Sequence, residues 1–260
     1  MTLVIASEGG SPHYNLAFEE ALLHYASLRR RPAARLWINP PSIVIGYTLR
    51  ACEEVKCEAA RKNLVPIVRR VSGGGAVYHD YGNVNISLAL PVRMGVREAY
   101  RLITGLIISI LKDLGLDARV ENFNDVAVGP WKVSGTSAAI RSNATLVHGT
   151  LLVNTDHRVI HKYVIPRLDR VERGEVSRVK YNPRSISDIL GTNLDPLEVI
   201  KPIASNVRSA LGVGGLTLEE TPREVSSLAM KLCIEKYSSD PRWSPLDKGT
   251  CLEPRPISTL

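Results

Sequence analysis

Three consecutive glycines, Gly73, Gly74 and Gly75, constrain the fold of this chain more than any other feature of its sequence. Glycine loses more backbone freedom on folding than any other residue, so a triplet disfavours both helix and strand at this point. Residues 65–69 before the triplet and 76–78 after it have the composition of short strands. The triplet therefore predicts a loop between two strands.

Two interpretations of this loop remain open on local grounds. Its bare backbone can approach a ligand and point N–H groups at an anion, and the preceding Arg69 and Arg70 can donate paired hydrogen bonds to phosphate or carboxylate. A flexible hairpin turn accounts for the same residues equally well. The loop is neither a P-loop nor a dinucleotide-binding fingerprint, because it lacks the Lys-[Ser/Thr] ending and no helix follows it.

Helical and extended patterns are mixed along the chain, without regular βαβ alternation. This order predicts an α+β fold in which mixed or antiparallel sheets are flanked by helices. Helices are expected at 15–30, 52–63, 97–114, 157–170, 185–190, 195–211 and 222–237. Strands are expected at 35–38, 42–46, 65–69, 76–78, 83–88, 118–120, 126–128, 133–140 and 145–153. Residues 173–184 read as a basic loop, 212–215 as a glycine-rich turn and 239–260 as a trailing coil.

Two segments carry the clearest patterns. Apolar residues recur on one face of 97–114, and Gly115 is placed to end that helix. Polar and apolar residues alternate through 83–88, where Asn83, Asn85 and Ser87 are expected to form the polar face of a half-buried strand.

The chain is basic, with 33 Lys and Arg against 26 Asp and Glu and a net charge of +7. This excess suits phosphate-bearing ligands, acidic proteins or nucleic acid. No basic–aromatic interleaving is present, so a nucleic-acid partner is not expected. No apolar run approaches the ~20 residues that span a bilayer, and the N-terminus lacks the pattern of a signal peptide. We therefore expect a cytoplasmic protein that does not contact a membrane.

The four cysteines, Cys52, Cys57, Cys233 and Cys251, are too few for a disulfide scaffold in a chain of 260 residues. The spacing between Cys52 and Cys57 matches neither a CxxC pair nor a zinc ribbon, so no metal site is expected there.

Four polar residues are candidates for a functional site, and the first three also have a structural explanation. His79 follows the glycine loop, although a lone histidine in a strand-turn is more often a structural hydrogen-bond partner. Asp125 can bind adenine, sugar or a metal, or shape an Asx turn. Lys132 begins a core strand and can stabilise charge on a reacting phosphate or acyl oxygen, or remain a solvated surface charge. His148 opens another strand, where Gly149 leaves room for a ligand.

Several motifs in order resemble the lipoate–protein ligase family, within the wider biotin and lipoate ligase fold. They are Arg69-Arg70-Val71-Ser72-Gly73-Gly74-Gly75-Ala76-Val77-Tyr78-His79-Asp80-x-Gly82-Asn83, Asn124-Asp125, Lys132-Val133-Ser134-Gly135 and His148-Gly149-Thr150-Leu151-Leu152, with support from Asn15-Leu16-Ala17-Phe18-Glu19-Glu20, Val44-Ile45-Gly46, Lys236-Tyr237-Ser238-Ser239 and Trp243. The resemblance spans most of residues 1–243.

The resemblance implies a two-step reaction. The carboxylate of lipoate attacks the α-phosphate of ATP, with Mg²⁺ assisting, to give lipoyl-adenylate and pyrophosphate. The amine of a lysine on an acceptor domain, of the E2 or H-protein type, then displaces AMP. An amine cannot usefully attack a free carboxylate, and phosphoryl chemistry needs positioned cations and N–H donors.

The resemblance also implies roles for particular residues. Lys132 is expected to contact both the α-phosphate and the lipoyl carbonyl, which makes it the candidate catalytic residue. The expected ATP-binding residues are Arg70, Gly75, Ala76, Val77, Tyr78, Lys132 and Asp125, the last also a candidate Mg²⁺ ligand. The expected lipoate-binding residues are Ser72, Gly73, Gly74, His79, Lys132, Ser134, Gly135, His148 and Gly149.

The expected organisation is one catalytic domain over 1–238, with a helical tail from about 195, followed by a C-terminal tail over 239–260. Ligases of this family often carry a small additional C-terminal domain, which is not evident in this sequence. A separate small accessory subunit is therefore expected to complete the enzyme. The alternative is a chain that is active alone or makes only the adenylate.

Three other functions are less consistent with the residues. An octanoyl- or lipoyl-transferase of the same fold needs a thiol nucleophile, and no cysteine lies between Cys57 and Cys233, although Cys52 or Cys57 can still fold near the site. A biotin ligase would carry a Gly-Arg-Gly-type loop in place of the glycine triplet. A non-catalytic lipoyl-domain docking module would be expected to lose the lysine or the arginines, which are present.

Overall fold

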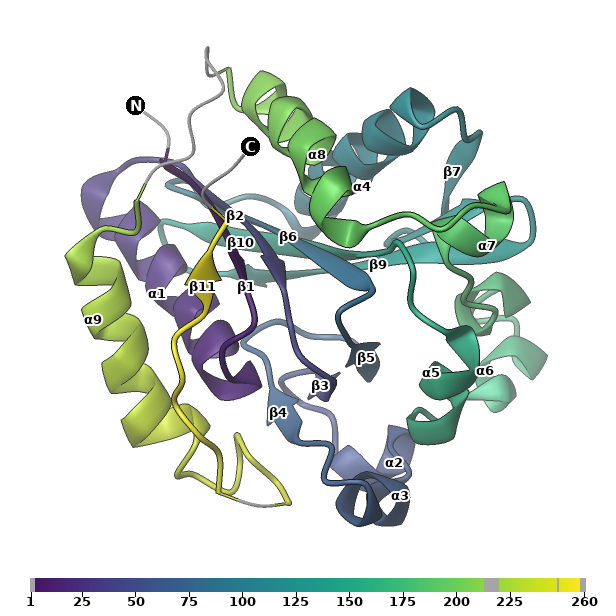
Figure 1. The fold of residues 1–260 in the computed structure, drawn as a ribbon, viewed down its shortest axis with the longest axis horizontal. Helices are drawn as coiled ribbons and strands as arrows, with labels where there is room; N and C mark the ends of the chain where they lie inside the picture. Colours follow the sequence, from purple (N-terminus) through teal and green to yellow (C-terminus); the bar gives the residue numbers. More distant parts are fainter. Residues whose placement is uncertain (1–2, 213–219, 247, 258–260) are drawn as a thin grey trace.

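Eight strands form the central sheet of the computed structural model, which describes residues 3–212, 220–246 and 248–257 (Figure 1). Their order is β11-β1-β2-β6-β10-β9-β8-β7, and of the neighbouring pairs only β1 and β2 run parallel. A smaller sheet has the order β4-β3-β5. The strands are β1 (Leu3–Glu8), β2 (Ala33–Ile38), β3 (Ser42–Ile45), β4 (Ile67–Arg69), β5 (Val77–His79), β6 (Asn83–Leu90), β7 (Ala118–Glu121), β8 (Asp125–Val128), β9 (Trp131–Ile140), β10 (Thr145–Leu152) and β11 (Arg255–Pro256). These mixed sheets confirm the predicted α+β class.

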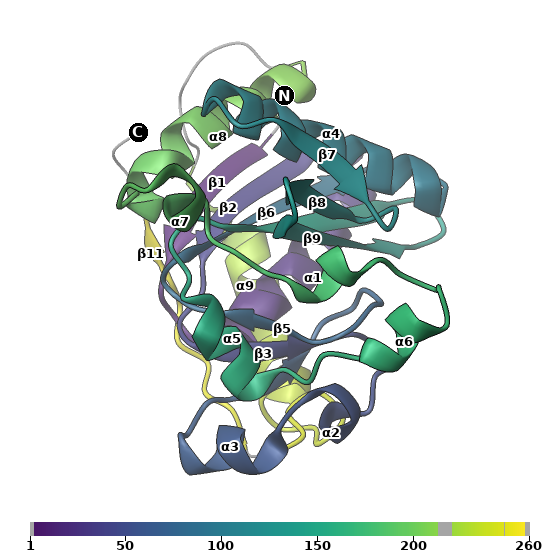
Figure 2. The ribbon, with the colours of Figure 1, turned by 90° about the vertical axis from the view of Figure 1, so that its right-hand side faces the viewer.

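Helices cover both faces of the central sheet, with α4 and α8 on one side and α1 and α9 on the other (Figures 1 and 2). The α-helices are α1 (Pro12–Arg29), α2 (Ala51–Glu54), α3 (Cys57–Lys62), α4 (Val96–Asp113), α5 (His157–Tyr163), α6 (Leu168–Glu172), α7 (Ile186–Leu190), α8 (Pro196–Ala210) and α9 (Arg223–Leu232). A 3₁₀ turn, η1, spans Arg178–Tyr181, and a π-helical turn, η2, spans Cys233–Tyr237. Within these described residues, no helix has both the length and the apolar content needed to cross a lipid bilayer.

The helix predicted at 97–114 is present as α4, and its apolar stripe faces the central sheet. Ile103, Ile107 and Ile110 are at most 1% exposed and share one core cluster with apolar side chains of β6, β9 and β10. Burying each of these side chains contributes about 1.5–3 kcal/mol. Gly115 follows the helix with a φ of 78°, the left-handed conformation that ends helices and that glycine adopts without a steric cost.

The prediction that β6 exposes a polar face is wrong, because that face is buried beneath α1. Asn83, Asn85 and Ser87 are at most 3% exposed. The Ser87 hydroxyl donates to Glu19 of α1 at 2.6 Å and accepts from the Trp37 indole at 2.9 Å, while the Asn85 amide donates to the Trp37 carbonyl. Ser87 and Asn85 are tolerated in the interior because their side chains find hydrogen-bond partners there.

Two segments predicted as single helices are each divided. Residues 157–170 form α5 and α6, because Pro166 lacks an N–H group and disfavours helical geometry in the residue before it. Residues 52–63 form α2 and α3, which Val55 separates by making an isolated bridge to Val164. Of the glycine turn expected at 212–215, residues 213–215 lie outside the described part of the chain.

The edge of the central sheet contains two strands that sequence patterns did not predict. Residues 3–6 of β1 are all apolar and at most 3% exposed. Because the strand is buried on both faces, its sequence does not alternate between polar and apolar residues. β1 also pairs with the short strand β11. In the segment 239–260, which was expected to be a trailing coil, residues 255 and 256 are therefore docked on the sheet as β11.

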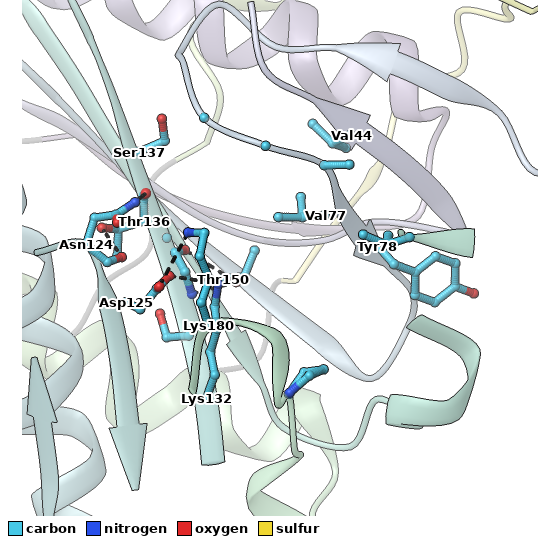
Figure 3. A pocket seen from close by; sticks show the side chains of 18 of the residues that line it. Val44, Val77, Tyr78, Asn124, Asp125, Lys132, Thr136, Ser137, Thr150 and Lys180 are labelled. Atoms are coloured by element: carbon cyan, nitrogen blue, oxygen red, sulfur yellow. Dashed lines mark hydrogen bonds and ion pairs between the residues drawn. The ribbon is translucent and has the colours of Figure 1, made fainter. Parts of the chain in front are cut away.

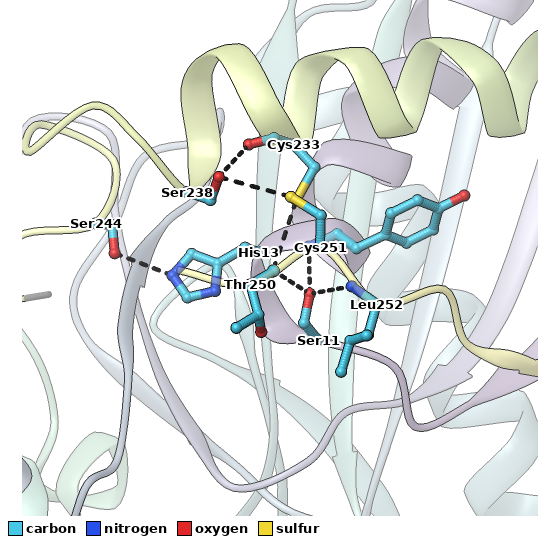
Figure 4. The surroundings of a disulfide bond; sticks show 9 residues. Ser11, His13, Cys233, Ser238, Ser244, Thr250, Cys251 and Leu252 are labelled. Atoms are coloured by element: carbon cyan, nitrogen blue, oxygen red, sulfur yellow. Dashed lines mark hydrogen bonds between the residues drawn. A yellow bond between two sulfur atoms is a disulfide. The ribbon is translucent and has the colours of Figure 1, made fainter. Parts of the chain in front are cut away.

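A disulfide and several hydrogen bonds fix this C-terminal segment against α1 (Figure 4). Cys233 is bonded to Cys251, and the Ser11 hydroxyl donates to the Thr250 carbonyl at 2.5 Å and accepts from the Leu252 amide at 3.2 Å. A second disulfide joins Cys52 to Cys57. The four cysteines thus form two local cross-links, although their small number had predicted no disulfide scaffold.

Two of the motifs that carry the family resemblance meet beside this segment. The Lys236 ammonium group and the Tyr237 hydroxyl both bind the carboxylate of Glu20 on α1, each at 2.7 Å. Trp243 packs against Tyr237 with ring centroids 5.0 Å apart, and Lys236 lies over the Trp243 ring. The motif after α9 therefore anchors the chain end to the first helix.

His13 of α1 is expected to make the stability of the fold pH-dependent. The ring is 4% exposed, and burial lowers its pKa to about 4. Between pH 6.5 and 4 the unfolded chain binds a proton that the folded chain does not, so stability falls as the pH falls through this window. We expect the free energy of unfolding, measured in urea, to fall by about 2 kcal/mol more in the wild type than in His13→Gln between pH 7.5 and 5. Equal losses in both proteins would contradict this.

Candidate active site

A cavity of ≈ 470 Å³ lies beside the glycine loop, within the usual size range of small-molecule sites (Figure 3). Its walls come from the small sheet, from α1 and β8 to β10, and from residues 160–183. Most of the predicted site residues line it, namely Arg70, Gly74, Gly75, Ala76, Val77, Tyr78, His79, Asp125, Lys132, Ser134, Gly135, His148 and Gly149. Ser72 and Gly73 are not among its lining residues.

The guanidinium group of Arg70 holds the glycine loop in shape. It donates to the carbonyls of Val44, Gly73 and Gly75 at 3.1, 2.5 and 2.9 Å, and to the Ser72 hydroxyl at 3.1 Å. Burial lowers the pKa of Arg70 to about 10, so the group remains charged at neutral pH. Most of its donors are used within the protein, so in this structure the group orients the loop.

Arg69 is also used internally, contrary to the idea that it donates to phosphate or carboxylate. Its guanidinium group donates to four backbone carbonyls, those of Gly46, Tyr47, Leu49 and Arg242, at 2.6–3.1 Å. Buried carbonyl groups need such partners, and a chain turn at residues 46–49 supplies several of them together.

The glycine loop itself does bind an anionic group through its backbone. The Ala76 amide donates to the carboxylate of Glu54 at 2.9 Å, and Glu54 also lines the cavity. Gly75 allows this close approach, because an added Cβ would stand 2.3 Å from the Glu54 oxygen and the glutamate side chain would have to move. Of the two interpretations of the loop, this contact supports the anion cradle over a flexible turn.

An ion pair between Asp125 and Lys132 lies on the opposite wall of the cavity (Figure 3). The β8–β9 hairpin brings them together at 2.7 Å between Oδ1 and Nζ, and a second ammonium group, that of Lys180, lies 3.5 Å from Oδ2. Burial alone would raise the pKa of Asp125, but the two lysines lower it below its ordinary value. Gly135 leaves room for this arrangement, since an added Cβ would stand 3.1 Å from the Lys132 nitrogen.

The surroundings of Asp125 do not fit a resident Mg²⁺ ion. Each carboxylate oxygen already faces an ammonium group, and such cations repel a divalent ion. In the described part of the chain, no three His, Cys, Asp or Glu side chains form a cluster that could hold a metal.

A second polar network joins three elements beside the cavity. The Glu19 carboxylate of α1 lies 2.7 Å from Nδ1 of His148, and the opposite ring nitrogen lies 2.6 Å from the Ser72 hydroxyl. Burial would raise the pKa of Glu19, but His148 above all, together with Ser87 and Arg35, holds it below its ordinary value. Ser72 thus orients the His148 ring, which does line the cavity.

His79 lines the cavity and has a buried ring nitrogen without a partner among the described residues. The Asn39 amide nitrogen, which can only donate, lies 3.2 Å from Nδ1 of His79, so the proton of the neutral ring is assigned to Nε2. Burial lowers the pKa of His79 to about 3, which keeps the ring neutral. Nε2 has no partner among the described residues, and such a buried donor is suited to a ligand.

Sequence reasoning did not place Trp37, Asn85, Ser137 or Lys180 at this cavity, although all four line it. Lys180 belongs to the basic segment 173–184, whose composition predicted a loop but not its position. Glu19 was noted only as part of a motif on the first helix, and no local signal indicated its contact with a residue 129 positions away.

No thiol is available near the cavity, because all four cysteines are in disulfides. The lining instead combines the ammonium groups of Lys132 and Lys180 and the backbone of the glycine loop with the apolar side chains of Trp37, Val44 and Leu16. This combination suits a ligand with a phosphate and an apolar chain.

Comparisons with known proteins agree with this chemistry. Residues 11–208 match the lipoyl protein ligase A/B catalytic domain. A lipoate-protein ligase A homologue from Aeropyrum pernix is 50% identical over 253 residues, which cover 97% of this chain and 96% of that protein. A structure from an analysis of a bi-partite lipoate protein ligase and its E2 lipoyl domain from Thermoplasma acidophilum superposes with a TM-score of 0.78 at 26% identity. The match covers 93% of this chain and 94% of that one. A crystal structure of lipoate-protein ligase A bound with ATP has a TM-score of 0.79 at 26% identity and covers 92% and 96%.

Proposed function

The chain belongs to the lipoyl protein ligase A/B catalytic domain family, and we propose that it is an ATP-dependent lipoate–protein ligase. A carboxylate oxygen of lipoate attacks the α-phosphorus of ATP, and the bond to pyrophosphate breaks. The amine of an acceptor lysine then attacks the acyl carbon, AMP leaves, and the nitrogen loses a proton as the amide forms. The observation that carries the proposal is the Lys132–Asp125 pair facing the glycine loop across the cavity.

In this proposal Lys132 is the catalytic residue. Its side chain lines the cavity and is 16% exposed, and its ammonium group can contact the α-phosphate and the acyl oxygen as negative charge moves between them. Asp125 fixes the position of the ammonium group. The backbone of the glycine loop, from Gly75 to Tyr78, supplies N–H groups for the nucleotide, and ATP displaces the Glu54 carboxylate from the Ala76 amide.

The acyl chain occupies the part of the cavity that is lined by Trp37, Val44, Gly149, His79 and His148. Mg²⁺ enters with ATP as the counter-ion of its phosphates, since the Asp125 site does not fit a resident ion.

The disulfides argue against a transferase that carries the acyl group on the enzyme. Such an enzyme needs a free thiol, and Cys52, Cys57, Cys233 and Cys251 are all bonded. Acyl activation by ATP is the chemistry that the remaining residues support.

Lipoate-dependent exchange of labelled pyrophosphate into ATP tests this function. We expect the isolated chain to catalyse exchange in the presence of lipoate and Mg²⁺. Exchange should stop when EDTA is added or lipoate is omitted. An absence of exchange under these conditions, or exchange that does not depend on an acid, would contradict the proposal.

The acceptor in this proposal is a lipoyl domain of the E2 or H-protein type, and a small accessory subunit completes the transfer step. The similarity to the bi-partite ligase of Thermoplasma acidophilum supports both partners. Transfer of lipoate to an isolated acceptor domain should be slow with this chain alone and rise when the accessory subunit is added. Full transfer without any partner would refute the two-part arrangement.

A further inference from the structure

Lys180 provides a second ammonium group at the carboxylate that pairs with Lys132. Its Nζ lies 3.5 Å from Asp125 Oδ2, while Lys132 Nζ lies 2.7 Å from Oδ1, and both lysines line the cavity. The Lys180 side chain is 20% exposed and the Asp125 side chain 1%. One lysine would suffice to neutralise Asp125, so the second requires another explanation.

The backbone around Lys180 is positioned by hydrogen bonds on both sides. The Ser177 amide donates to the Asn122 side chain at 2.8 Å. On the other side, the segment lies along the start of β9, where the Lys132 amide donates to the Asn182 carbonyl and the Lys132 carbonyl accepts from the Arg184 amide. Lys180 is therefore held beside Lys132 by main-chain contacts to the same residue, and not by its own ion pair alone.

The charges of Lys132, Lys180 and Asp125 sum to one positive charge. Lys132 and Lys180 share a single carboxylate, whereas the neighbouring cation Arg170 has its own partner in Glu175 at 2.9 Å. Burial, and then the nearby Lys132 charge, lower the pKa of Lys180. An anion placed between the two ammonium groups would balance the excess and relieve their repulsion.

We propose that Lys180 binds the α-phosphate of the acyl-adenylate from the side opposite to Lys132 and retains this intermediate until the acceptor lysine arrives. The inference rests on the proposed function. Once the acid oxygen has bonded to the α-phosphorus and pyrophosphate has left, the phosphate of the acyl-adenylate carries one negative charge, which matches the excess charge of Lys132, Asp125 and Lys180. Lys180 then acts after the first step, whereas Lys132 acts in both.

The test compares Lys180→Gln, Lys180→Arg and Lys162→Gln. Lys162 is a matched control because it lies on α5 and its ammonium group binds Asn63 outside the cavity. Each protein is mixed with labelled lipoate and Mg·ATP without acceptor, and the loss of bound lipoyl-adenylate is followed by rapid gel filtration. Lipoate binding without ATP is measured in parallel by calorimetry.

We expect Lys180→Gln to release the adenylate about 10- to 100-fold faster than the wild type, the effect of losing one charge-assisted hydrogen bond. Its affinity for lipoate alone should stay within about twofold, because that ligand lacks the phosphate. Lys180→Arg should retain most of the adenylate, and Lys162→Gln should match the wild type.

Three results would overturn this role of Lys180. Wild-type retention in Lys180→Gln would show that the group does not hold the phosphate. An equal loss of lipoate binding and adenylate retention would indicate that Lys180 only supports the cavity wall, as would a failure of Lys180→Arg to restore retention. A wild type that forms no adenylate would instead refute the proposed function, so the two failures are distinguishable.

Discussion

Replacing Lys132 by methionine is expected to lower the rate of lipoate-dependent pyrophosphate exchange by about 100- to 1000-fold, the usual cost of removing one group that stabilises developing charge. Methionine preserves most of the apolar stem, so the fold should be retained. Lys180 remains beside Asp125 and keeps that buried carboxylate paired. The large effect should therefore appear in the exchange rate and not in the free energy of unfolding.

Two measurements accompany this substitution. Lys132→Arg should recover part of the exchange rate, because it restores the positive charge with a different shape. Unchanged exchange in Lys132→Met would remove Lys132 from the mechanism. A loss of exchange would also contradict a catalytic role if urea titrations showed that the substitution unfolds the protein to the same extent.

Gly46→Ala is expected to have an effect of similar size without touching the ligand. An added Cβ at Gly46 would stand 1.9 Å from the Gly74 carbonyl oxygen, so the glycine loop has to move. A displacement of about 1 Å in a positioning element can cost about 100-fold in rate. Since the loop supplies backbone N–H groups to the nucleotide in the proposed mechanism, we expect exchange to fall by about 100-fold, with a stability loss of about 1–3 kcal/mol.

Gly105→Ala is the matched control for this steric argument. Gly105 lies within α4, and an added Cβ would meet no atom within 4 Å. We expect unchanged exchange and a gain of about 0.5–1 kcal/mol in stability, because alanine restricts the unfolded chain and suits a helix. Full exchange activity in Gly46→Ala would mean that the loop does not have to occupy its observed position.

Sequence predicted best those elements whose determinants are local. The stripe of α4 and the loop at the glycine triplet depend on spacing and on backbone entropy within a few residues. β1 was missed because a strand buried on both faces lacks alternation. The exposed face predicted for β6 was wrong because the partners of its polar residues, Glu19 and Trp37, lie some 50 to 70 positions away.

The site was predictable in its residue types but not in its pairings. The resemblance implied a role for Lys132, Asp125 and His148, and the cavity contains all three. Their orienting partners could not be inferred, because Glu19 and Lys180 reach the cavity through tertiary packing. For Arg69 the residue type itself was misleading, because arginine is suited to phosphate but here donates to backbone carbonyls. The residue type alone does not tell whether an arginine will bind a phosphate or a backbone carbonyl.

Quenching a single turnover tests the central claim most directly. The chain is mixed with labelled lipoate and Mg·ATP in the absence of acceptor, the protein is denatured in acid, and the products are separated by chromatography. We predict about one lipoyl-adenylate per chain, none of it attached covalently to the protein. Label that stays on the protein as an acyl-enzyme, or the absence of any adenylate, would contradict an active site built around Lys132, Asp125 and the glycine loop.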